Sequence, residues 1–378
     1  MSCPAPIADA SGAMHNAVVS APNRASTLDS EGRLEEAIEP LAGPWDELAD
    51  RVGAPPFLRP GWIAAWWRAF GSGDLEILSL QRGEILDGLL PLARRRRALT
   101  SPTNYHSPVF GPLAKDAPAA RELVLDACSR RLRRVEISLL DEDDPSLEQC
   151  RAGAESAGYR VLMRRQSRTP FLALDGDWDT YRGRLHKNLR NDLRRQRRRL
   201  NELGEVTVEL ADGSERLEPL LGEMFSIEGS GWKDARGTAI ASRPETRRFY
   251  EEIAEWAACR GSLRLWFLRL DGRPVASDIC LEEGGVCYLL KAGYDPQFRR
   301  YSPGNLILGA IIEHCFASRL DRIELGGGVG PYKLRWAETI RDRRLLQAFR
   351  RSPPGLFEWA AFAYGRPAAK RLLRRDRD

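Results

Sequence analysis

The feature that most constrains the fold is a segment in the second half of the chain, where a strand, a basic turn and an apolar helix follow one another. Residues 286–291 predict a strand, and Arg299 and Arg300 lie in the turn that follows it. Ser302-Pro303-Gly304 then opens an apolar helix predicted over residues 305–316, because proline is pre-shaped for the first helical turn. The free N–H groups of a helix start, beside two arginines, favour an anion. The segment therefore predicts an α/β unit that binds a phosphate group.

A second strand and a glycine-rich turn follow this helix. Residues 323–325 are predicted to form a buried strand that runs into Gly326-Gly327-Gly328, and Tyr332-Lys333 comes shortly after the glycines. Glycine allows a ligand or another backbone segment to approach closely. The strand, the phosphate-binding helix start, the second strand and the glycine turn together predict a cofactor-binding unit.

Four short motifs in this region carry a resemblance to a known family. They are Gly293-Tyr294-Asp295, Tyr301-Ser302-Pro303-Gly304, Glu324-Leu325-Gly326-Gly327-Gly328 and Tyr332-Lys333. Together they resemble the C-terminal half of a GNAT-type acyltransferase. More narrowly, they resemble the CelD/BcsL-like branch of cellulose-biosynthesis proteins, which is related to Fem-type aminoacyltransferases. The resemblance is clear over residues 165–350 and looser over residues 40–165. The commoner GNAT phosphate loop is richer in glycine and Gln/Arg, and only Arg299 and Gly304 keep that pattern here.

The resemblance implies an α/β fold, with α+β mixed sheets, in which two GNAT-like lobes pack side by side and the C-terminal lobe carries the cofactor site. With the periodicity of the chain, it gives four expected regions. They are a disordered leader (1–38), an N-terminal lobe (39–165), a C-terminal acyltransferase lobe (166–352) and a basic helical tail (353–378).

Composition sets wider bounds on the class of protein. The 378 residues are 43% hydrophobic and 29% charged, which is ordinary for a globular chain of two domains. Seven scattered cysteines without a C-x-x-C pair favour reduced thiols in the cytoplasm, and no His or Cys spacing predicts a metal site. No run of eighteen apolar residues and no secretory signal are seen, so a cytoplasmic location is expected.

The donor expected from the resemblance is acetyl-CoA or another acyl-CoA. We expect its pyrophosphate to bind the backbone of the turn before the apolar helix, aided by the two arginines. These residues are Arg299, Arg300, Tyr301, Ser302, Gly304 and Asn305. The alternative is that Ser-Pro-Gly only caps the helix.

Three residues are candidates for the chemistry. Glu324 is placed near the thioester by the resemblance and is a candidate general base; the alternative is a solvent-facing strand residue. Tyr332 is expected to protonate the leaving thiolate, and Lys333 to bind phosphate or stabilise the oxyanion. Alternatively, the tyrosine packs and the lysine extends along apolar surface to solvent.

Candidates for binding the acceptor are spread over both lobes. Some lie at the end of the central strand, where ligands gather in such sheets, and others in loops or at the start of a basic helix. They are His106, Asn188, Arg190, Trp232, Lys291, Tyr294 and Asp295. The alternative for Tyr294 and Asp295 is a purely structural turn, and a lone histidine is a weak signal.

Residues 182–199 form a helix rich in arginine, with Asp192 the only acid among its charges. It is either a site for RNA or another phosphate-bearing partner, or the solvated face of an amphipathic helix. The leading hypothesis is an acyl-CoA-dependent N- or O-acyltransferase acting on a sugar, a polysaccharide precursor or another small amine or hydroxyl. The alternatives are a Fem-like transferase that moves an aminoacyl group from tRNA to a cell-wall precursor, and a non-catalytic accessory protein of polysaccharide synthesis.

Overall fold

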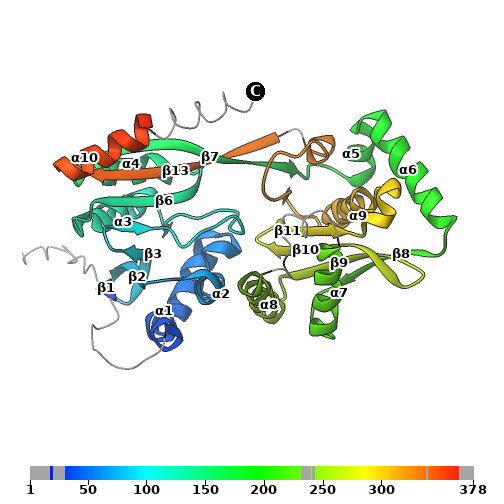
Figure 1. Ribbon diagram of the computed structural model, residues 1–378, viewed down its shortest axis with the longest axis horizontal. Helices are drawn as coiled ribbons and strands as arrows, with labels where there is room; N and C mark the ends of the chain where they lie inside the picture. The colour runs from blue at the N-terminus through cyan, green and yellow to red at the C-terminus, as the bar shows by residue number, and fades with distance from the viewer. Residues whose placement is uncertain (1–17, 20–29, 231–239, 241–242, 338, 366–378) are drawn as a thin grey trace, which may run out of the picture.

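The computed structural model describes residues 18–19, 30–230, 240, 243–337 and 339–365. Two lobes lie side by side, and two long strands pass from one lobe to the other (Figure 1). Across the described ranges, no helix combines the length and the apolar character that a membrane crossing requires.

The first lobe holds most of the elements up to β7. They are β1 (Val18–Val19), α1 (Ser30–Val52), η1 (Pro56–Leu58), α2 (Pro60–Phe70), β2 (Asp74–Arg82), β3 (Ile85–Arg95), β4 (Ala98–Thr100), β5 (Leu113–Ala114), α3 (Ala117–Ser129), β6 (Arg134–Asp141), α4 (Ser146–Ser156) and β7 (Tyr159–Ala173).

The second lobe follows β7, and the chain then returns to the first. Its elements are α5 (Trp178–Arg184), α6 (Lys187–Asn201), β8 (Val206–Ala211), α7 (Leu217–Gly229), α8 (Pro244–Cys259), β9 (Leu263–Leu270), β10 (Arg273–Glu283), β11 (Val286–Tyr294), η4 (Pro296–Tyr301), α9 (Pro303–Ala317), β12 (Arg322–Glu324) and η5 (Lys333–Arg335). The chain ends with β13 (Thr339–Arg350), α10 (Pro353–Ala360) and η6 (Ala361–Gly365).

One mixed sheet of 13 strands runs through both lobes in the order β1-β2-β3-β4-β6-β13-β7-β12-β11-β10-β9-β8, with β5 beside β3. Strand β7 pairs with β13 along its length and with β12 at its end, so it belongs to both lobes. The mixed α/β fold expected from the sequence is confirmed. The expected border between residues 165 and 166 falls inside β7, because the backbone ladder of β7 continues where the side-chain pattern changes.

Two helices differ from the sequence expectation. Helix α1 begins at Ser30, inside the region expected to be a leader, because Leu34 and Ala37 lie on its apolar face and are only 3% and 2% exposed. The single helix expected over residues 182–199 is divided between α5 and α6. The break falls at His186, whose side chain accepts a hydrogen bond from the Asn188 N–H and caps α6.

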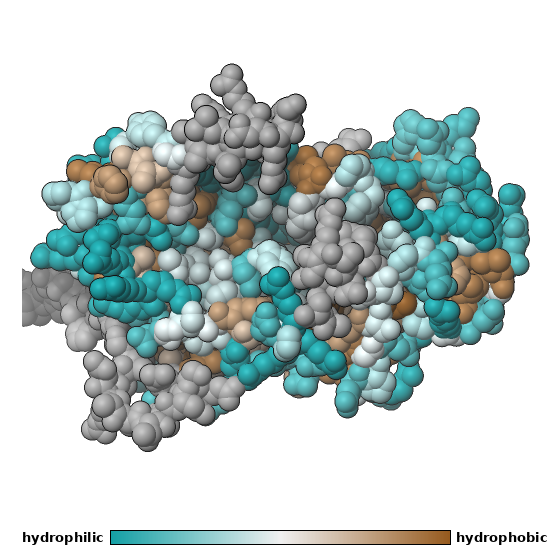
Figure 2. Space-filling model, viewed as in Figure 1, coloured by the Kyte–Doolittle hydropathy of each residue, from teal (hydrophilic) through white to brown (hydrophobic). Residues whose placement is uncertain are grey.

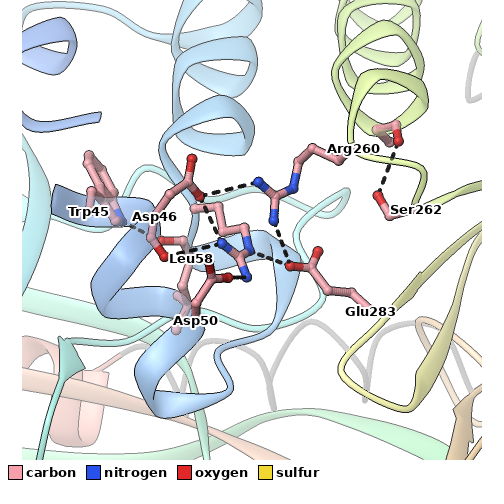
Figure 3. A network of polar contacts seen from close by, with 9 residues as sticks. Trp45, Asp46, Asp50, Leu58, Arg260, Ser262 and Glu283 are labelled. Carbon is pink, nitrogen blue, oxygen red and sulfur yellow. Dashed lines mark hydrogen bonds and ion pairs between the residues drawn. The ribbon is translucent and has the colours of Figure 1, made fainter. Parts of the chain in front are cut away.

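An ion-pair network ties the lobes together (Figure 3). The buried guanidinium of Arg59 contacts Asp46 of α1 at 2.8 Å and also pairs with Glu283 at the end of β10. Arg260, after α8, lies 3.2 Å from the same Glu283 carboxylate and 3.7 Å from Asp46. A first-lobe arginine and a second-lobe arginine therefore share carboxylates from both lobes.

Candidate active site

The central feature of the second lobe is the point where β11 and β12 separate. The two strands pair in parallel only from Val286 to Tyr288, opposite Arg322 to Glu324. Just beyond this, Leu290 is an extra residue in the β10–β11 ladder, since Leu289 pairs with Cys280 and Lys291 pairs with Ile279. A bulge leaves backbone groups outside the ladder. Polar backbone groups of β11 are thereby available where the neighbouring strand has left.

The turn after β11 leads into the apolar helix α9. Asp295 is buried and caps η4, accepting from the Gln297 N–H at 2.9 Å and from Arg273 at 2.6 Å. Ser302 adopts the left-handed conformation with φ of 50°. The N–H of Ser302 donates to the backbone carbonyl of Arg299, and the N–H of Asn305 donates to the backbone carbonyl of Ser302. Two of the four amides expected to hold a pyrophosphate are therefore engaged in the turn, and Asp295 has a structural role in it.

Gly304 and its surroundings retain the features of an anion site. A Cβ built on Gly304 would meet only the Tyr294 ring at 3.7 Å, an ordinary contact, so the fold itself does not require glycine there. Arg299 and Arg300 are exposed, and Arg199 of α6 lies 5.7 Å from the Tyr301 ring. Figure 2 shows hydrophilic side chains over the end of the molecule where α5 and α6 lie. The positive charge of α6 therefore reaches the turn that precedes α9.

The glycine turn after β12 is held by Lys333. Its buried ammonium donates to the carbonyls of Gly326 at 3.1 Å and Gly327 at 2.9 Å. Gly326 has φ of 72°, and a Cβ there would lie 2.5 Å from the Leu289 carbonyl oxygen. Lys333 therefore fixes the turn beside the bulged strand, and its expected contact with a phosphate or an oxyanion stays a prediction.

Trp336, shortly after Tyr332, contacts both the start of α9 and α5. The Trp336 indole donates to Asn305 Oδ1 at 3.2 Å, and its main-chain carbonyl accepts from the Tyr181 hydroxyl at 2.6 Å. Although 47% of Tyr332 is exposed, burial of its hydroxyl and the nearby Asp278 raise its pKa to about 12. A tyrosine with this pKa stays protonated at neutral pH and keeps a proton to donate.

Glu324 is buried, not solvent-facing. Its Oε1 lies 3.1 Å from both Arg322 and Arg341, and Arg343 lies 4.0 Å from its Oε2. Burial raises the pKa of this carboxyl, while the three arginines act in the opposite direction. Because Arg343 also pairs with Asp141 of β6 at 2.5 Å, Glu324 is part of a network that joins the lobes. Its role as a base stays a prediction.

A second polar group lies where the first lobe meets α7 and α8. Lys291 pairs with Glu228 of α7 at 3.3 Å, and its Nζ lies 5.9 Å from the Tyr250 ring. The Tyr250 hydroxyl is 3.1 Å from His106 Nδ1. Burial, with Lys291 and Arg243 nearby, lowers the pKa of His106 to about 3, so the imidazole is neutral at physiological pH. The structure thus brings the two predicted acceptor residues His106 and Lys291 to one buried cluster.

The other predicted acceptor residues lie elsewhere. Asn188 is exposed at the first turn of α6, and Arg190 donates to the Gly183 carbonyl at 3.1 Å. They are on the side of α6 and α9, away from His106. Trp232 lies outside the described residues.

Sequence reasoning missed Glu228, Tyr250 and Trp336. Glu228 and Tyr250 lie on apolar faces of helices and are 2% exposed. For Glu228, the sequence did hold a signal, because a carboxylate occupies a position where the helical pattern predicts an apolar residue. No local pattern marks Trp336, because its contact with Asn305 depends on tertiary packing.

Comparison with known proteins agrees with this geometry. Residues 187–334, from α6 to η5, match the family described as an acetyltransferase (GNAT) domain. No curated protein matches the chain. The second lobe is therefore an acyltransferase domain of the GNAT type.

Among the solved structures with a similar fold, two match most of the chain. One is the C-terminal domain of a protein assigned as a lysylphosphatidylglycerol synthetase from Agrobacterium fabrum, with 14% identity, a TM-score of 0.55, and coverage of 86% of this chain and 96% of that one. The other is FemX, with 11% identity, a TM-score of 0.55, and coverage of 80% and 95%. At these identities the likeness describes the fold alone.

Proposed function

We propose that the protein transfers an acyl group from an acyl-CoA to an amine or hydroxyl of a sugar, a polysaccharide precursor or another small acceptor. The observation that carries this proposal is the separation of β11 from β12 at the Leu290 bulge, next to the start of α9. Backbone groups released there are placed to meet the acyl end of a donor whose phosphates lie at the helix start. The domain match supports the reaction class.

The residues on the α9 side fit a phosphate-bearing donor. The open space at Gly304 would admit the pyrophosphate, and Arg299 and Arg300 would neutralise it. Tyr332, protonated at neutral pH, would give its proton to the departing thiolate. The thioester supplies an already activated acyl group, so the protein needs mainly to position the reactants.

We place the acceptor on the opposite face of β11, in the cluster around His106 and Lys291. The buried Nε2 of His106 has no hydrogen-bond partner in the described structure, and a neutral imidazole can accept a proton. Polysaccharide precursors are the acceptors suggested by the CelD/BcsL-like motifs. The unpaired thiols of the described cysteines support a cytoplasmic location.

Gly304→Ala tests the donor site. Because a Cβ meets no close atom there, the variant should fold at least as stably as the wild type, since alanine favours a helix over glycine. The methyl group should nevertheless weaken binding of acetyl-CoA or a longer acyl-CoA about tenfold or more, which is about 1.4 kcal/mol. Binding is measured by calorimetry and by the ligand-dependent rise in melting temperature.

Gly222→Ala in α7 is the matched control, since it is also a helical glycine and its Cβ meets nothing within 4 Å. It should leave acyl-CoA binding unchanged. If both variants and the wild type bind acyl-CoA with equal affinity, the start of α9 is not part of the donor site. No heat from any acyl-CoA with the wild type would reject the CoA donor.

An aminoacyl-tRNA donor is the second candidate, favoured by the position of α6 beside η4 and by the fold shared with FemX. RNA binding should then weaken steeply with salt. Neutralising Arg194, Arg195, Arg197 and Arg198 should abolish the RNA mobility shift. Neutralising the run from Arg94 to Arg97 in the first lobe removes the same number of charges and should not. A non-catalytic accessory role in polysaccharide synthesis would require that neither donor binds.

A further inference from the structure

A cluster of thiols lies between the sheet and the last turn of α9, at the opposite end of this helix from the turn proposed to face the donor. Cys280 and Glu282 of β10 and Cys287 of β11 share one sheet face, and Cys315 of α9 packs against them. All three cysteines are 0% exposed. None of these residues has a part in the proposed transfer.

Three of these groups converge on one point. One carboxylate oxygen of Glu282 and the sulfurs of Cys287 and Cys315 all lie within 4.8 Å of one another. A tetrahedral zinc ion holds such ligand atoms roughly 3.3–3.8 Å apart, so side-chain shifts of about 1 Å would close the shell. Two strands and a helix supply the ligands, which makes the arrangement rigid.

A fourth group lies beside this triad. His314, next to Cys315 on α9, has its Nε2 3.2 Å from Glu282 Oε1. Arg264 lies 2.8 Å from the other oxygen of the same carboxylate. Zn²⁺ with two thiolates and one carboxylate carries a net charge of −1, which Arg264 balances. A neutral imidazole preserves this balance, whereas a third thiolate from Cys280 would not.

We propose that Cys287, Cys315, Glu282 and His314 form a binding site for a zinc ion. The site joins β10, β11 and α9 from the side opposite the acceptor cluster. Uptake of Zn²⁺ breaks two S–H bonds, forms two Zn–S bonds and releases two protons to solvent, with no change of oxidation state. The metal has a structural role, since it fixes the helix whose first turn faces the donor.

A further observation supports the site. An open groove of about 590 Å³ is lined by Arg264 and His314, which both contact the Glu282 carboxylate. The groove therefore brings solvent to the two residues that lie beside Glu282.

The test uses the full-length, reduced protein incubated with Zn²⁺ and then desalted. Elemental analysis should find one zinc per chain, and Co²⁺ in its place should give a thiolate-to-cobalt charge-transfer band. Cys315→Ala should lose the zinc and the band. Cys128→Ala, an equally buried thiol of the first lobe, should lose neither.

His314→Ala provides a second test in case Cys315→Ala does not fold. His314 lies at the edge of the cluster with 25% of its side chain exposed, so its replacement should disturb the core less. It should lower zinc affinity at least tenfold in competition with a chelator, while the cobalt–thiolate band persists. The proposal is overturned if folded wild-type protein retains no more zinc than Cys315→Ala, or if Cys287 and Cys315 form a disulfide with each other in preference to taking up Zn²⁺.

Discussion

His106 shows how tertiary position determines the chemistry of a residue. In the sequence it is one histidine in a loop, but in the structure it stacks on Phe70 at 5.6 Å and meets the Tyr250 hydroxyl. Removal from water excludes the charged imidazolium, so its pKa falls to about 3. A neutral imidazole beside Lys291 is therefore a property of the assembled lobes.

This lowered pKa predicts a pH dependence of stability. Below about pH 6.5 the unfolded chain protonates His106, while the folded protein resists protonation until about pH 3. Above about pH 6.5 the titration of His106 therefore leaves the free energy of unfolding unchanged. As the pH falls below this value, the free energy of unfolding decreases by at most about 1.4 kcal/mol per pH unit. Urea unfolding of His106→Gln should show a shallower acid dependence than the wild type. Unfolding free energies of His106→Gln that change with pH in parallel with those of the wild type would contradict the prediction.

At the scale of elements, the turn after β12 separates the two central strands. Gly326 takes a left-handed conformation directly against the Leu289 carbonyl, and Lys333 binds the turn's outward carbonyls. The sequence shows three consecutive glycines but does not indicate that Gly326 and Gly328 take the left-handed conformation while Gly327 does not. Of the three, only Gly326 lies against β11, so a side chain there would also clash with that strand.

Two alanine substitutions in this turn should therefore differ sharply. Gly326→Ala combines a left-handed backbone with a Cβ clash at 2.5 Å, and should lower the free energy of unfolding by about 2 kcal/mol or more. Gly327→Ala meets nothing within 4 Å and should change it by less than about 0.5 kcal/mol. Chemical denaturation of both variants checks this, and equal losses would show that the turn does not pack against β11.

At the scale of the molecule, the two lobes are one structural unit. Strands β7 and β13 carry the sheet across, and Arg59 binds carboxylates of both lobes. The proposed acceptor cluster lies at this junction, since His106 comes from the first lobe and Lys291 from the second. The distance between the two lobes therefore determines how far apart His106 and Lys291 lie.

Arg59→Met tests the junction. It leaves Asp46 and the mostly buried Glu283 without their main cation, and should cost about 3–5 kcal/mol of unfolding free energy. Arg151→Ala breaks only exposed pairs within α4 and should cost less than about 1 kcal/mol. Urea unfolding measures both, and similar small losses would mean that the Arg59 network does not hold the lobes together.

Most local features of the second lobe could be predicted from the sequence. The strand before Lys291, the helix start at Ser302-Pro303-Gly304 and the glycine turn after Glu324 lie where their residue types place them. The start of α1 was misplaced because Leu34 and Ala37 follow a stretch without periodicity. The continuity of β7 was missed because a backbone ladder leaves no side-chain signal at the lobe border.

The sequence alone determined the mixed α/β character and the position of the strand, helix and glycine turn that we propose bind the donor, because helix starts, glycine turns and apolar periodicity depend on neighbouring residues. The tertiary structure decided which charged groups act together. Glu324 joins three arginines, Lys333 holds a turn, and His106 meets Lys291 through Tyr250. These outcomes depend on burial and on distances between remote segments, which set the energy of a charge and which no local pattern encodes.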